Sequence, residues 1–238
     1  MTVAAGFQVK TIEALADQPA DYRAAVEKIV ISHSINELYG TVRYDEPALA
    51  LAPDPHAKWL VSRIVMEEYG HHVRFFDLGR QLGIAPERLV PGDSKKRPLS
   101  IFEFEMTGWE DFCALKMLGD LAELLQIEDL IQASFLPLRN LARMTMAEER
   151  FHADFGLDRC VEFCATRQGR ARVEDAVGRI YPRMAAFFGA AGSRNNEIFR
   201  AWRIKRRTNE QMAADYEARV AELLRSRLGL ALPAVTAA

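Results

Sequence analysis

Apolar and polar positions recur with helical spacing along most of the chain, and no run rich in valine, isoleucine or threonine alternates between turn residues. The pattern therefore predicts an all-α protein. A first helix is expected from about 21 to 43, ending before Pro47, and a second from near Pro55 to near Gly83. The stretch 84–100 contains three prolines and is expected to form a long connection.

The rest of the chain is predicted to add four more helices, at 101–126 or 109–126, about 128–166, 170–188 and 208–227. Pro137 is expected to kink or interrupt the second of these, because proline has no backbone N–H. Two helices, a long connection, two more helices and C-terminal additions form the order of a ferritin-like four-helix bundle. We interpret 1–238 as a single domain, with a core at about 21–166 and C-terminal helices at about 170–228.

Two of the predicted helices carry the same short motif, Glu-x-x-His, as Glu68 to His71 and as Glu149 to His152. Residues three apart on a helix lie about 60° apart around its axis, so the carboxylate and the imidazole project to one side. Each pair can therefore hold one metal ion. A single such motif is common on solvated helices, but two of them on paired helices indicate a dimetal site.

Each motif has an acidic residue about 30 positions upstream, on the preceding helix: Glu37 for the first and Asp120 for the second. Val30 and Leu38 make the helix around Glu37 apolar, which favours an inward-facing carboxylate. Glu123 lies one turn beyond Asp120 on the same face and could replace it, although we favour Asp120. The predicted metal ligands are Glu37, Glu68, His71, Asp120, Glu149 and His152.

Four carboxylates and two imidazoles suit iron or manganese better than zinc, which favours fewer ligands and accepts thiolates. Carboxylates can bridge two metals and change between one- and two-oxygen binding, which leaves positions open for O2. The ligand set therefore predicts two iron ions, or one manganese and one iron, with O2 as co-substrate.

Other polar residues near the motifs receive structural interpretations. Glu67, His72 and Glu148 are expected to face outward or to support the ligands. His33, one turn before Glu37, could be a ligand, but a hydrogen-bonded histidine of the bundle is the favoured interpretation. Cys160 and Cys164, four apart on one helix, are interpreted as packing thiols.

Composition and charge narrow the functional classes. A formal net charge of -2 and a pI near 6.2 give no support for a nucleic-acid or anionic-membrane partner. No uncharged apolar run approaches the roughly 20 residues that a membrane-spanning helix needs. The N-terminus shows no signal-peptide pattern, and the three cysteines fit a reducing compartment, so a cytoplasmic location is expected.

The motifs and the segments around them resemble the catalytic A subunit of the ring-1,2-phenylacetyl-CoA epoxidases, a family of bacterial multicomponent di-iron oxygenases. The resemblance covers roughly 35–224 and is carried by the segments 37–40, 68–71, 100–120, 148–152 and 202–210. It supports Asp120 over Glu123 as a ligand. The chain departs from the family in a shorter N-terminal part and in the bulky Tyr69 before Gly70.

The resemblance implies that one oxygen atom of O2 is added across an aromatic double bond of an acyl-CoA such as phenylacetyl-CoA. It also implies a separate reductase, since three cysteines cannot supply the usual four ligands of an Fe–S cluster and no Gly-x-Gly-x-x-Gly segment follows a strand. A structural subunit or a second copy of the chain is a further expected partner. Two basic runs could bind the CoA phosphates: Lys95, Lys96 and Arg97, or Lys205, Arg206 and Arg207.

Three alternatives stay open on the sequence alone. A related di-iron oxygenase could act on another substrate. A ferritin-type iron-binding protein would predict a self-assembling cage, against which the long C-terminal extension argues. A structural subunit with a decayed metal site would not retain six candidate ligands.

Overall fold

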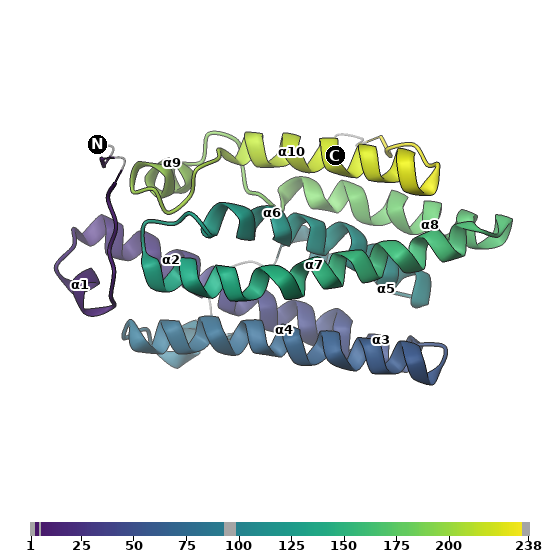
Figure 1. Cartoon of the computed structure of the whole chain (residues 1–238), viewed down its shortest axis with the longest axis horizontal. Coiled ribbons are helices and arrows are strands. Elements are labelled where there is room, and N and C mark those ends of the chain that lie inside the picture. The colour runs from purple at the N-terminus through teal and green to yellow at the C-terminus, as the bar shows by residue number, and fades with distance from the viewer. Residues whose placement is uncertain (1–2, 5, 93–98, 235–238) are drawn as a thin grey trace.

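The computed structural model describes residues 3–4, 6–92 and 99–234, and no strand occurs among them apart from an isolated bridge between Val9 and Phe135. Long helices run side by side along the molecule, with α8 and α10 lying along the bundle on the side opposite α4 (Figure 1). The α-helices are α1 (Glu13–Ala16), α2 (Ala20–Gly40), α3 (Glu46–Leu51), α4 (Pro55–Gln81), α5 (Trp109–Leu115), α6 (Leu121–Leu130), α7 (Leu136–Cys164), α8 (Arg167–Ile180), α9 (Arg194–Ala201) and α10 (Asn209–Leu223). The chain is an all-α ferritin-like bundle, as the sequence pattern predicts.

The first long helix does not end before Pro47, so that boundary was wrong. A π-turn at Thr41–Asp45 joins α2 to α3, and the helical path continues to Leu51. In this turn the Glu46 N–H donates to the Thr41 carbonyl, one residue further back than in an α-helix. The backbone hydrogen bonding thus changes next to Pro47, which has no N–H to donate. The helix therefore tolerates the missing bond.

The third helix of the bundle begins at Trp109 and runs through a second π-turn at Lys116–Asp120 into α6. Ser100–Glu103 is a separate 3-10 turn, so the later of the two predicted starts is confirmed. The helix predicted at 128–166 is interrupted near Pro137, as expected, since α6 ends at Leu130 and α7 begins at Leu136. Pro137 lies in the first turn of α7, where its missing N–H has no intrahelical partner to lose.

The C-terminal part begins with α8 and a 3-10 helix at Tyr181–Ala186, in place of one helix at 170–188. The short helix α9 was not predicted. The helix expected at 208–227 is confirmed as α10 with a π-turn at Leu224–Leu228, and a capping box of Thr208 and Gln211 starts it.

The basic run between α9 and α10 is part of the fold. Lys205 Nζ donates to Gln126 Oε1 at 2.6 Å, and the Arg206 backbone N–H donates to Asp129 Oδ2 at 2.8 Å. Arg207 forms ion pairs with Asp129 and Asp215. Lys205 and Arg207 therefore anchor the C-terminal segment to α6, which argues against this run as a phosphate site.

Two clusters of buried apolar side chains among the described residues hold these helices together, one of them between α5, α7, α8 and α10. Cys113 and Cys160 are buried in it as free thiols, which confirms the packing interpretation of Cys160. Among the described residues, no helix combines the length and the apolar character that a membrane crossing requires.

Gly156 on α7 sets how closely that helix approaches the segment that carries Asp120. A Cβ atom at this position would lie 2.6 Å from the Cys113 carbonyl oxygen and would also clash with the Met117 backbone nitrogen. Since both neighbours are backbone atoms, they cannot move aside as a flexible side chain would. The glycine therefore fixes the distance between two of the helices that face the bundle centre.

We expect Gly156→Ala to lower the free energy of unfolding by about 2–3 kcal/mol, because it overpacks a backbone contact. Gly178→Ala is the matched control, since a Cβ atom there has nothing within 4 Å. It is expected to be neutral or slightly stabilising. Chemical denaturation of both variants measures the difference, and equal stabilities would contradict the close approach.

Candidate metal centre

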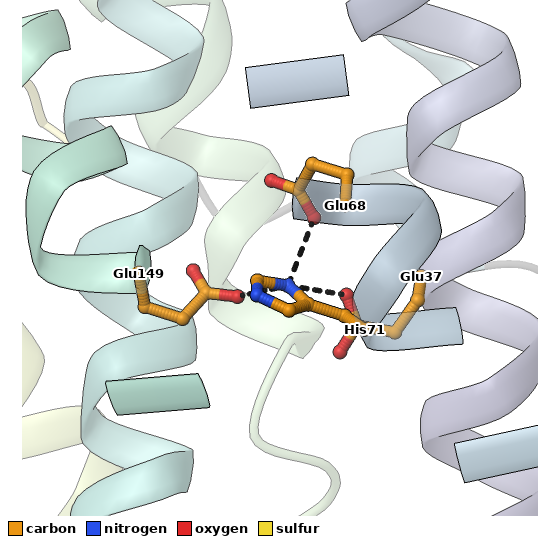
Figure 2. A group of neighbouring side chains, drawn as sticks. All are labelled: Glu37, Glu68, His71 and Glu149. Atoms are coloured by element: carbon orange, nitrogen blue, oxygen red, sulfur yellow. Dashed lines mark ion pairs between the residues drawn. The ribbon is translucent and has the colours of Figure 1, made fainter. Parts of the chain in front are cut away.

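The six predicted ligands come from four neighbouring segments and meet inside the bundle. Glu37 lies on α2, Glu68 and His71 on α4, Asp120 at the end of the π-turn before α6, and Glu149 with His152 on α7. All six are buried, with at most 8% of their surface exposed. Figure 2 shows Glu37, Glu68 and Glu149 converging on His71.

The ligand atoms form two overlapping groups in which all atoms lie within 4.8 Å of one another. The groups are Glu37, Glu68, His71 and Glu149, and Glu68, Asp120, Glu149 and His152. Glu68 and Glu149 belong to both. Each group would hold one ion, and Glu68 and Glu149 would contribute to both.

Both imidazoles turn their Nδ1 atoms toward these carboxylates. His71 Nδ1 lies 3.0 Å from Glu149 Oε1 and 3.4 Å from Glu68 Oε2, and His152 Nδ1 lies 3.1 Å from Glu68 Oε1. Among the described residues, neither Nδ1 atom nor Glu149 Oε2 has a hydrogen-bond partner of good geometry. Buried polar atoms without partners are costly, so these donor atoms fit a shared cation.

The opposite ring nitrogens are held by the acidic residues that precede each motif, in a crossed arrangement. His71 Nε2 donates to Glu148 Oε2 and His152 Nε2 donates to Glu67 Oε2, both at 2.9 Å. A carboxylate accepts only, so each Nε2 carries the proton and each Nδ1 is left for the metal. Glu67 and Glu148 thus support the ligands, in agreement with one of the two roles predicted for them.

An arginine also donates hydrogen bonds to each of these two glutamates. Arg74 donates to both oxygens of Glu148, at 2.6 and 3.0 Å, and Arg63 donates to Glu67 Oε1 at 2.8 Å. Burial alone would raise the pKa of Glu148, but the hydrogen bonds from His71 and Arg74 lower it to about 2. This carboxylate stays ionised and keeps the His71 ring oriented.

We expect Glu148→Gln to weaken metal binding about 10–100-fold, because an amide orients His71 less strongly than a carboxylate does. Competition with a chromophoric chelator measures the affinity. The control is Glu110→Gln, which alters an exposed ion pair with Arg172. An unchanged affinity in Glu148→Gln would contradict the supporting role.

The close packing of charged groups in this cluster strongly shifts the pKa values of its members. Burial opposes the protonated imidazole, yet the hydrogen bond to Glu67 and the close Glu68 carboxylate raise the pKa of His152 to about 9. Burial raises the pKa of Asp120 well above its usual range, and the nearby Glu149 and Glu68 add to the rise. Closely packed carboxylates of this kind repel one another and are neutralised by cations.

Lys116 and Asp45, which the sequence analysis did not single out, also belong to this cluster. The Lys116 ammonium lies 2.6 Å from Glu68 Oε1, 2.8 Å from Asp120 Oδ2 and 3.3 Å from Asp45 Oδ1. Burial alone would lower its pKa, but these carboxylates hold the pKa of Lys116 well above its usual range. The sequence signal that could have identified Lys116 is its position inside the apolar stretch just before Asp120.

Several other sequence-predicted residues are placed by the structure. Asp120 lies in a group with Glu68, Glu149 and His152, whereas Glu123 lies in a different group with His33 and Glu37. His72, expected to face outward or to support the ligands, does not face outward. His72 is buried, and its Nδ1 donates to the Ser34 carbonyl at 2.8 Å, which ties α4 to α2. The run Lys95, Lys96 and Arg97 lies outside the described residues.

A cavity of about 80 Å³ adjoins the two groups. One wall carries carboxylates of the metal centre, and the other is apolar and aromatic, with Ile101, Phe102, Met184 and Phe187. A small site with one polar and one apolar wall can place an apolar group of a ligand beside bound metal.

A comparison with protein families matches the whole chain, residues 1–238, to the family described as phenylacetic acid catabolic protein. No curated protein matches the chain.

Proposed function

The chain belongs to the phenylacetic acid catabolic protein family, and on this premise we propose that it is a di-iron monooxygenase that epoxidises an aromatic acyl-CoA such as phenylacetyl-CoA. The proposal rests above all on the two buried ligand groups that share Glu68 and Glu149. Glu37, Glu68, His71, Asp120, Glu149 and His152 would hold the two ions. Bound iron would supply the activation of O2, for which open coordination positions are needed.

The side chains of the chain itself would orient the ligands and exclude water. Glu67 and Glu148 fix the tautomers of the two histidines, so that each Nδ1 faces the centre. The apolar wall with Phe102 and Phe187 would place an aromatic ring next to the metals and keep bulk water away. Lys116 would hold a proton at Nζ beside Glu68.

The family and the sequence support the proposed substrate class and partners. The basic residues Lys95, Lys96 and Arg97 precede Ile101 and Phe102 of the cavity wall by only a few positions, which supports them as the site for CoA phosphates. A separate cytoplasmic reductase would deliver two electrons, and a structural subunit or a second copy of the chain would complete the enzyme.

The test is iron reconstitution followed by anaerobic titration with phenylacetyl-CoA, with phenylacetate and free CoA as controls. We expect two irons per chain and a change in the near-infrared circular dichroism of the ferrous centre with phenylacetyl-CoA alone. Two irons without a response would shift the proposal to a related oxygenase with another substrate. Fewer than one iron per chain would overturn it.

A further inference from the structure

A third group of ligand-type side chains lies beside the two groups of the metal centre. His33, Glu37 and Glu123 each offer an atom within 4.8 Å of the others. His33 and Glu37 lie one turn apart on α2, and Glu123 lies on α6. The six ligands proposed above account for Glu37 but not for His33 or Glu123.

The two carboxylate oxygens of Glu37 point toward different histidines. Its Oε2 lies 3.8 Å from His71 Nδ1, and its Oε1 lies 3.8 Å from His33 Nδ1. The side chain is more than nine-tenths buried, and Oε1 has no hydrogen-bond partner among the described residues. A buried carboxylate oxygen aimed at a histidine in this way is suited to a cation between the two groups.

Glu123 closes the group from the other side. Its Oε2 is also buried without a hydrogen-bond partner among the described residues. A divalent cation between Glu37 and Glu123 would supply the partner that both of these buried oxygens lack.

The group also has space around it. A second cavity of about 190 Å³ is lined by His33, Asn36 and Glu123, and both Asn36 and Glu123 also line the cavity beside the metal centre. The third group therefore lies between the two cavities. Lys205 lines the outer cavity as well, but its ammonium donates to Gln126.

We propose that His33, Glu37 and Glu123 bind a third divalent cation, Fe²⁺ or Mn²⁺, more weakly than the two ions of the main centre. One imidazole and two carboxylates form a ligand set that these metals accept. Weaker binding follows because three protein ligands replace four. The sharing of Glu37 between the third ion and the main centre rests on the proposed dimetal centre. The contribution of Glu123 to the third site does not.

The probe is Mn²⁺ alone, added anaerobically to the full chain and measured by equilibrium dialysis with paramagnetic resonance of the free ion. We expect two ions to bind tightly to the unmodified protein and a third to bind more weakly. Glu123→Gln should lose only the weak ion. Glu128→Gln, on the same helix and in an ion pair with Arg219, should keep all three.

His33→Gln provides a second variant with the same expected loss, and the circular dichroism of each variant verifies its folding. A third ion that survives in both variants, or its absence from the unmodified protein, would overturn the proposal. Failure of the dimetal centre gives a different result. The two tight ions would be missing from the unmodified protein, and a Glu123-dependent site would then stand alone.

Discussion

Replacing Glu149 with alanine is expected to reduce bound iron to below one ion per chain and to lower turnover at least about 10³-fold. Glu149 belongs to both ligand groups, so its loss removes one donor from each ion at once. The remaining atoms cannot compensate, because Glu68 would then be the only residue that the two groups share. A loss of several kcal/mol in transition-state stabilisation corresponds to this change in rate.

The matched control is Glu162→Ala, which removes an exposed carboxylate from the same helix and breaks only a surface pair with Arg159. It should bind iron and turn over like the unmodified protein. Iron content is measured by colorimetric assay after reconstitution, and turnover by product formation with a supplied reductant. Full iron content and activity in Glu149→Ala would show that the proposed centre is not the site of reaction.

Much of the bundle could be predicted because helix order and proline positions are local properties of the sequence. The start of α4 at Pro55 and the long connection after it follow from proline at fixed positions. The same rule failed at Pro47, where a π-turn continues the helical path. It held near Pro137, where the helix is interrupted and the proline lies in the first turn of α7.

The grouping of the candidate ligands followed from spacing, since Glu-x-x-His places both side chains on one helix face. The crossed pairs of Glu67 with His152 and Glu148 with His71 did not, because they join α4 to α7. Such contacts depend on the register between two helices, which no single helix encodes. Gly156 contributes to that geometry through a backbone contact that sequence patterns do not reveal.

Lys116 was missed for a related reason. A lysine in an apolar stretch is usually interpreted as a side chain that extends to solvent, yet Lys116 is only 4% exposed. Its ammonium reaches Glu68 on another helix and Asp120 on its own. The Lys116 ammonium and two metal ions would therefore bind the same carboxylates, and the competition between ammonium and metal can be measured.

We expect Lys116→Met to lower the free energy of unfolding of the metal-free protein by about 3–5 kcal/mol, because it leaves buried carboxylates without their cation. Saturating Mn²⁺ should restore most of this stability, since the ions neutralise the same oxygens and bind the folded state. The control is Lys205→Met, which removes another buried lysine whose partner is the neutral Gln126. Its loss of stability should not be recovered with Mn²⁺.

We expect the variants Asp45→Asn and Lys116→Met to change the affinity for Mn²⁺ in opposite directions. Burial raises the pKa of Asp45 to about 7, although Lys116 acts against this rise. When metals occupy Glu68 and Asp120, Asp45 is the carboxylate to which the Lys116 ammonium can turn. Without it the ammonium competes more strongly for the ligands, so Asp45→Asn should bind Mn²⁺ more weakly and Lys116→Met more tightly than the unmodified protein. Changes of the same sign in both variants would show that Lys116 is a ligand-positioning group, and not a competitor of the metals.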